Sequence, residues 1–143
     1  MTSLPIIVKG IMTVEDAKLA VKAGVKAIVL SNHGGRNIDF SPSPLEIALE
    51  IYEEAPEIFN QTEVLADGGV RYGTDVLKLL ALGVKAVGLG RPFMYANVYG
   101  WEGVAKAIEL LKAEIAGDAA NLGVGDLKQI NSSYVSYLIS KTT

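Results

Sequence analysis

The sequence predicts an α/β fold built from four consecutive βα units, and three observations support this prediction. Short runs rich in Val, Ile and Leu recur along the 143 residues. Each run is almost continuously apolar, a pattern typical of parallel strands that are covered on both faces. Segments with helical spacing separate the runs, and alternating strands and helices predict a parallel sheet. We therefore expect a single α/β unit with a parallel sheet.

The elements follow one another in a regular order. The expected strands are PIIVKG, KAIVLSN, EVLADGG and KAVGLGR, and the expected helices cover residues 14–23, 44–55, 73–82 and 103–120. Thr13 is placed to cap the first helix, and Gly24 stands where that helix should end. The four units occupy residues 1–123. We expect residues 124–143 to form a tail that wraps the outside and is disordered at its far end.

The two halves of this region resemble one another. AGVKAIVLS corresponds to LGVKAVGLG, and Asp16 in the first half corresponds to Asp75 in the second. Such a repeat fits either an open doubly wound sheet or part of an eight-stranded (β/α)8 barrel. A complete barrel needs about 250 residues, so the chain has about half the material. A half-barrel leaves apolar edges and an uncovered inner face, which predict a homo-oligomer or pairing with a complementary N-terminal half-barrel.

Composition narrows the classes of function. The formal net charge of -3 leaves no basic stripe for a nucleic-acid backbone. The absence of cysteine excludes disulfides, thiolate nucleophiles and zinc-thiolate sites. A single histidine without an HExxH motif does not build the usual metal site. No apolar stretch approaches the roughly 20 residues of a membrane span, so we expect a soluble, intracellular protein.

Candidate functional residues stand where the predicted strands end. In β/α architectures, catalytic groups gather at the carboxyl ends of the strands. The four strands end in Lys9, in Ser31 followed by Asn32 and His33, in Asp67-Gly68-Gly69, and in Gly90-Arg91. A lysine inside an apolar strand is costly to bury unless it meets an anion or an electron-rich ring. The alternative for Lys9 is a side chain that reaches solvent at the strand end.

The segment SNHGGR contains the only histidine of the chain. Imidazole is suited to proton abstraction near neutral pH, and Arg36 can hold a carboxylate through two hydrogen bonds. Gly34 and Gly35 allow the backbone to approach a substrate closely. A base beside a carboxylate clamp indicates a 2-substituted acid as substrate. The alternative for His33 is a structural imidazole.

Two glycine loops indicate a phosphate site after the last two strands. DGGVRYGTD and GLGRPF each lead into a helix and carry Arg71 and Arg91. Helix N-termini at this end of a barrel often bind phosphate through free N–H groups. The alternative is that the glycine pair serves only a tight turn. The sequence contains neither a Walker A loop nor a complete GxGxxG fingerprint.

Four segments together carry a resemblance to a known family. LPIIVKG, LSNHGGRNID, ADGGVRYGTDVLKLLALG and VGLGRPFMYA resemble the FMN-dependent 2-hydroxy-acid oxidoreductases, which include glycolate oxidase, lactate oxidase and flavocytochrome lactate dehydrogenase. The resemblance runs from Leu4 to about Gly123. It implies strands five to eight of a (β/α)8 barrel, FMN as cofactor, and oxidation of L-2-hydroxy acids to 2-oxo acids.

The resemblance also implies roles for the matching residues. Lys9 would face the N1/O2 edge of the flavin, and Ser31 would lie near the flavin and the ribityl chain. His33 would be the base that takes a proton from the 2-hydroxy acid, and Arg36 would bind its carboxylate. The residues that would hold the ribityl hydroxyls and the phosphate are Asp67, Gly68, Gly69, Arg71, Gly90 and Arg91.

The chain departs from the family pattern in two ways. Tyr72 stands where many relatives carry a second arginine. The first half of the barrel, which supplies substrate tyrosines and the aspartate that orients the histidine, has no counterpart here. We therefore expect the isolated chain to have little or no activity. The alternative is a self-associating half-barrel that binds FMN or phosphate without turnover.

A second resemblance points to a different enzyme class. VLADGGVRYGTDVLKLLALG is also similar to the phosphate loop of the inosine-monophosphate dehydrogenase family. That class uses a cysteine nucleophile, and this chain has no cysteine. The hydroxy-acid interpretation is therefore preferred.

Overall fold

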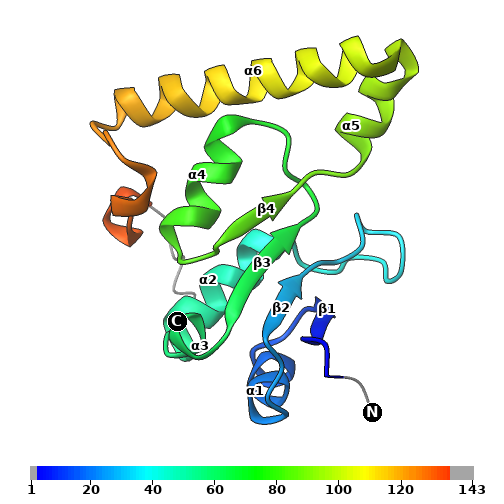
Figure 1. Cartoon of the computed structure of the whole chain (residues 1–143). Coiled ribbons are helices and arrows are strands. Elements are labelled where there is room, and N and C mark those ends of the chain that lie inside the picture. Colours follow the sequence, from blue (N-terminus) through cyan, green and yellow to red (C-terminus); the bar gives the residue numbers. More distant parts are fainter. Residues whose placement is uncertain (1–2, 136–143) are drawn as a thin grey trace.

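Four parallel strands form one sheet in the order β1, β2, β3, β4 (Figure 1). The computed structural model describes residues 3–135. The strands span Ile7–Ile11, Ala27–Leu30, Glu63–Asp67 and Ala86–Gly88. Every neighbouring pair is parallel, so the predicted α/β fold with a parallel sheet is confirmed.

Helices alternate with the strands. They are α1 (Val14–Lys22), α2 (Pro44–Glu54), α3 (Ile58–Gln61), α4 (Gly73–Ala81), α5 (Arg91–Ala96) and α6 (Gly100–Asn121). Short 3-10 turns lie at Asn97–Tyr99, Leu127–Gln129 and Ser132–Tyr134. The first two predicted helices and α4 agree with the sequence to within one residue at each end. The sequence pattern does not predict α3, because one turn of helix is too short to show a periodicity.

Caps define where the first helices begin and end. The Thr13 hydroxyl accepts a hydrogen bond from the Asp16 amide at 3.1 Å, as the sequence predicts. Gly24 follows α1 with φ of +77°, a conformation that favours glycine. Ser43 and Glu46 form a capping box at the start of α2. These caps fix the ends of the loops that lead into and out of the sheet.

One face of the sheet packs against helices. Ile28, Leu30, Val64 and Ala66 point to this face and are at most 1% exposed. They form a core with apolar side chains of the helices, including Ala17 of α1, Ile47 and Ile51 of α2, and Leu79 of α4. The alternate strand positions point to the opposite face. On that face Lys9, Val29, Leu65 and Ala86 lie in register across the four strands.

A bulge in β1 places Lys9 and Ile11, which are two positions apart, on opposite faces of the sheet. The pairing with β2 shifts between Lys9 and Ile11, and Gly10 between them has φ of +96°. Without the extra residue, positions 9 and 11 would share a face. With it, Ile11 is 6% exposed in the core while Lys9 points away from the helices. The bulge therefore returns Ile11 to the core while Lys9 stays on the opposite face.

The long helix α6 lies across α4 in Figure 1. A Cβ at Gly73 would lie 2.7 Å from the Ile115 backbone nitrogen, so glycine permits this close crossing. α6 begins at Gly100, three residues before the predicted start at Gly103. Gly103 lies inside the helix. A Cβ there would collide with the carbonyl oxygen of Ala96, so this position needs a glycine. It is a packing glycine and not the start of the helix.

The segment after α6 returns to the helix layer. Val124 is buried against Leu77 and Ala119, and the Tyr52 hydroxyl contacts the Ser132 hydroxyl at 2.6 Å. The expectation of a disordered far end concerns residues outside the described range. Within residues 3–135, no helix is both long enough and apolar enough to cross a membrane.

Candidate functional site

A cavity of about 690 Å³ lies at the carboxyl ends of the strands. Its lining includes nine of the ten site residues predicted from the sequence: Lys9, His33, Arg36, Asp67, Gly68, Gly69, Arg71, Gly90 and Arg91. The tenth, Ser31, is 3% exposed and hydrogen-bonds two polar side chains of the site. Segments that are far apart in the sequence therefore meet at one site, as expected for strand ends of a parallel sheet.

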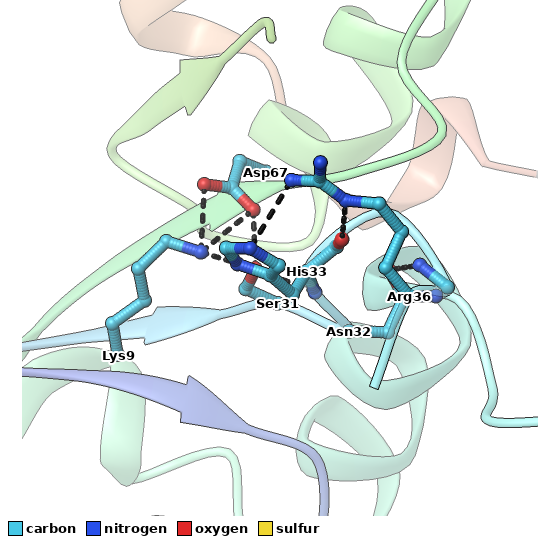
Figure 2. A network of polar contacts seen from close by, with 7 residues as sticks. Lys9, Ser31, Asn32, His33, Arg36 and Asp67 are labelled. Carbon is cyan, nitrogen blue, oxygen red and sulfur yellow. Dashed lines mark hydrogen bonds and ion pairs between the residues drawn. The ribbon is translucent and has the colours of Figure 1, made fainter. Parts of the chain in front are cut away.

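Lys9, Ser31 and Asp67 form one polar cluster from three neighbouring strands (Figure 2). The Lys9 ammonium donates to the Ser31 hydroxyl at 2.6 Å and pairs with the Asp67 carboxylate at 3.1 Å. The Ser31 hydroxyl donates to the same carboxylate. The Lys9 side chain remains 45% exposed, so part of its ammonium still faces the cavity. The anion expected to neutralise Lys9 is therefore supplied in part by the chain itself.

Residues 31–43, which we call the catalytic loop after the base predicted at His33, are held by local hydrogen bonds. Ser31 Oγ accepts from the His33 amide at 3.2 Å. Asn32 Oδ1 accepts from the Gly35 amide at 3.1 Å, and Asn32 Nδ2 donates to the Pro42 carbonyl at 3.2 Å. We assigned no role to Asn32 from the sequence. An Asn directly before a glycine-containing turn is the signal that could have identified it.

His33 adopts an uncommon backbone conformation, with φ of +54°. A non-glycine residue in the left-handed region costs about 1 kcal/mol and occurs often at functional sites. The imidazole is exposed at the cavity and lies beside Arg36 (Figure 2). The loop therefore holds the only imidazole of the chain on a strained backbone position.

Arg36 contacts His33 in two ways. Its Nε donates to the His33 carbonyl at 3.1 Å, and its Nη2 lies 3.1 Å from His33 Nε2. Arginine has no acceptor, so Nε2 must accept, and the ring proton of a neutral imidazole must then be on Nδ1. The described residues supply no hydrogen-bond partner for Nδ1. The base and the carboxylate clamp predicted from the sequence are therefore adjacent.

The other end of the cavity is formed by the two glycine loops. Asp75 accepts hydrogen bonds from the Arg71 and Tyr72 amides, and Glu114 accepts one from the Gly73 amide. The amides of Arg71, Tyr72 and Gly73, which lead into α4 and are expected from the sequence to be free for phosphate, are therefore bonded to carboxylates of the chain. The side chains of Arg71 and Arg91 remain exposed at the cavity.

The cavity is cationic although the whole protein is acidic. Lys9, Arg36, Arg71 and Arg91 line it, and Asp67 is the carboxylate among its lining residues. The chain as a whole has a formal net charge of -3. This local excess of positive charge favours anionic ligands. Among the described residues, no cluster of His, Cys, Asp or Glu side chains could hold a metal ion.

The end of the catalytic loop is anchored on α2. The Ser43 amide donates to the Glu46 carboxylate at 2.6 Å, and this bond, with a further contribution from the Ser43 side chain, lowers the pKa of Glu46 below its usual value. The Glu46 amide in turn donates to the Ser43 hydroxyl at 3.3 Å. The loop therefore runs between two fixed points, the end of β2 and the capping box of α2.

Comparison with known proteins identifies the class to which this fold and site belong. The model of the FMN-dependent dehydrogenase family matches residues 1–137. The chain belongs to this family. FMN is the family's cofactor, so the cofactor predicted from the sequence resemblance is confirmed at the level of the family.

Individual relatives are similar over nearly the whole chain. L-lactate dehydrogenase (cytochrome) of Saccharomyces cerevisiae is 51% identical over 132 residues, which are 90% of this chain and 22% of the relative. 2-Hydroxyacid oxidase 1 of Mus musculus is 46% identical, over 94% of this chain and 36% of the relative. This chain therefore spans only about a third or less of these curated relatives.

Solved structures show the same arrangement. The recombinant flavin-binding domain of baker's yeast flavocytochrome b2 is 49% identical, with a TM-score of 0.88 over 93% of this chain and 35% of that one. A mandelate oxidase structure is 42% identical, with a TM-score of 0.82 over 92% of this chain and 39% of that one. The described fold thus matches one part of larger enzymes of the family.

Proposed function

We propose that this chain is the part of an FMN-dependent oxidoreductase that binds the cofactor phosphate and carries the base for oxidation of L-2-hydroxy acids to 2-oxo acids. In this proposal its sheet corresponds to strands five to eight of a (β/α)8 barrel. The observation that carries the proposal is the pairing of His33 with Arg36 at the same cavity as Lys9, Arg71 and Arg91. The family match and the two named relatives support it.

The residues of the cavity fit FMN in charge and in size. A cavity of about 690 Å³ is within the usual range for cofactor sites. Arg71 and Arg91 would hold the phosphate, and Lys9 would lie against the electron-rich edge of the ring system. Gly69 and Gly90 line the cavity, and a Cβ at either would meet no atom within 4 Å, so the backbone there is open to a ligand. FMN, when bound, accepts the two electrons that the substrate loses.

Arg36 and His33 would act on the substrate. The guanidinium of Arg36 binds the carboxylate of the 2-hydroxy acid through two parallel hydrogen bonds. The same guanidinium now donates to His33 Nε2, so a bound carboxylate would draw this donor away. Nε2 is then left with a free lone pair facing the substrate, and it takes the proton. Substrate binding and activation of the base would thus be one event.

The described part of the chain does not complete this machinery. His33 Nδ1 has no partner among residues 3–135, so nothing there stabilises the imidazolium that forms on proton transfer. For this reason we expect the isolated 143-residue chain to turn over slowly or not at all. The remainder of the barrel would supply the missing partner.

A second function follows from the uncovered face of the sheet. Ile7 is 54% exposed, and Val29 and Leu65 are only half-buried, on the face opposite the helices. Such a face favours association with a second copy of the chain or with a complementary half-barrel. In this alternative the chain binds FMN or phosphate and self-associates without turnover.

The first experiment tests where FMN is held. We expect FMN to bind the isolated chain at least about tenfold more tightly than riboflavin, because the phosphate contacts are present and much of the ring pocket is not. Arg71→Ala and Arg91→Ala should each weaken FMN without weakening riboflavin. Quenching of flavin fluorescence measures all these affinities. Equal affinities for FMN and riboflavin in the wild-type chain would contradict the proposal.

The second experiment tests the base. The FMN-loaded chain is mixed anaerobically with L-lactate, glycolate or a longer 2-hydroxy acid, and bleaching of the flavin is followed. We expect slow or no bleaching by the isolated chain, and faster bleaching after addition of the N-terminal part of a relative's catalytic domain. His33→Gln should lower the restored rate by about 100-fold or more. Restored bleaching that is the same with His33→Gln would overturn the assignment of the base.

A further inference from the structure

The side chain of Arg91, which follows the glycine loop after β4, also contacts the catalytic loop. Arg91, the first residue of α5, donates from Nη2 to the carbonyl oxygen of Gly34 at 2.8 Å. The two residues are 57 positions apart in the sequence. Gly34 directly follows His33, so the contact links the loop after β4 to the backbone beside the base. Both residues line the same cavity.

A side chain at position 34 would crowd this contact. A Cβ at Gly34 would lie 2.6 Å from Nη2 of Arg91, so any larger residue would displace the guanidinium. The neighbouring Gly35 has the same φ of +70°, yet a Cβ there would meet no atom within 4 Å. The two glycines therefore have the same φ and differ in their contact with Arg91.

The contact bonds the tip of the catalytic loop to a distant element. The hydrogen bonds from Ser31, Asn32 and Arg36 to the backbone of the loop all come from within it. Arg91 comes from the end of a different strand. A guanidinium has five N–H donors in a rigid plane, and the bond to Gly34 uses one of them. The remaining donors can therefore bind an anion while the bond to Gly34 is kept.

We propose that Arg91 is a positioning residue that couples the phosphate end of the cavity to His33. One N–H of its guanidinium holds the Gly34 carbonyl, and the others bind the phosphate of the cofactor. The coupling is reciprocal: an anion on Arg91 steadies the backbone that carries His33, and the bond to Gly34 orients Arg91 for the anion. This inference rests on the proposed function, because it requires a phosphate at Arg91.

The single histidine of the chain makes the coupling measurable, since its imidazole NMR signals report only His33. The probe is inorganic phosphate, which has no ring that could itself shift the signals. We expect phosphate to shift the His33 signals of the wild-type chain. Arg91→Gln should change the signals without ligand and abolish the phosphate-induced shift. Arg71→Gln, the matched control, should weaken phosphate binding yet leave the shift intact at saturation.

Three further variants separate the effect of side-chain geometry from the effect of charge. Arg91→Lys keeps the charge and loses the planar fork, so phosphate should still bind while its effect on His33 falls. Gly34→Ala should lower phosphate and FMN affinity about fivefold or more, whereas Gly35→Ala should change either by less than about twofold. Riboflavin affinity should respond equally to the two alanine variants, because riboflavin has no phosphate.

The outcomes distinguish this inference from the proposed function. If neither phosphate nor FMN binds the wild-type chain, the proposed function fails. The part of this inference that links anion binding at Arg91 to His33 then fails as well. Positioning is still decided without ligand, by the His33 signals of folded Arg91→Gln; signals identical to wild type would overturn it. A phosphate shift that persists in Arg91→Gln, or equal effects of the two alanine variants on phosphate affinity, would overturn the coupling. Far-UV circular dichroism confirms that each variant is folded.

Discussion

The two faces of the sheet carry similar apolar side chains but lie in different surroundings. On the face toward the helices, Ile28 and Val64 are fully buried. On the opposite face, their sequence neighbours Val29 and Leu65 are only half-buried, and Ile7 is 54% exposed. Near-continuous apolar runs are typical of strands in a sheet that is covered on both faces. Among the described residues, helices cover only one face of this sheet. The second face is therefore an incomplete core.

The two faces also differ in what they contribute to function. The covered face carries the packing energy of the described residues. The open face carries Ile7, Val29 and Leu65, and at its carboxyl end lies the cluster of Lys9, Ser31 and Asp67. The site therefore lies at the carboxyl end of the open face. Whatever covers that side would also close the site, which is why binding is expected from this chain more readily than turnover.

The largest expected effect comes from shortening one side chain on each face. Ile28→Ala should destabilise the chain by about 3 kcal/mol, because it leaves a cavity in a packed core. Val29→Ala should cost less than about 1 kcal/mol, since its side chain is already partly hydrated. Urea unfolding followed by circular dichroism, at a dilution where the chain is monomeric, measures both. Equal losses would show that the second face is covered within the monomer.

The next effect concerns association through the open face. If the wild-type chain self-associates as we expect, Leu65→Lys should raise the dissociation constant at least about tenfold, because it places a charge in the apolar contact. The control is Leu19→Lys on α1, where the leucine is already 62% exposed on the outside of the helix layer. Light scattering over a micromolar concentration range measures both. A wild-type chain that is monomeric throughout would contradict the prediction.

The smallest effect compares the polar edge of the open face with ordinary surface. A double-mutant cycle with Lys9→Met and Asp67→Asn should give a coupling energy of about 1 kcal/mol, kept small because solvent screens both side chains. The same cycle for the exposed pair Lys106 and Glu109, 3.0 Å apart, should give less than about 0.5 kcal/mol. Urea unfolding at low and high salt measures both cycles. Equal coupling in the two pairs would remove any special role of the cluster.

The sequence predicted the structure best where neighbouring residues in the chain determine the role of a residue. Thr13 caps α1 and Gly24 ends it as predicted, because caps and positive φ depend on neighbours in the chain. The order of the four strands and of α1, α2, α4 and α6 followed from periodicity, whereas α3 is too short to show one. The set of strand-end residues followed from the rule that parallel strands place their carboxyl ends together.

Other features could not be predicted, because their cause lies far along the chain. The sequence spacing predicts Gly103 as a helix start, whereas it lies inside α6 and permits the close approach of α6 to the end of α5. The pattern predicts Gly10 as an ordinary strand residue, whereas its bulge returns Ile11 to the core and leaves Lys9 on the open face. The amides at the start of α4 were expected to be free, whereas Glu114, 41 residues away, bonds one of them.

The sequence by itself determined the α/β class, the order of the elements, and which side chains could act as base, clamp and phosphate ligands. These properties depend on side-chain chemistry and on the spacing of nearby residues. The tertiary structure alone decided that the Asp67 carboxylate binds Lys9 and Ser31, that Arg91 reaches Gly34, and that one face of the sheet stays open. Such contacts depend on how segments far apart in the sequence pack together. The local spacing of residues does not determine the distance between those segments.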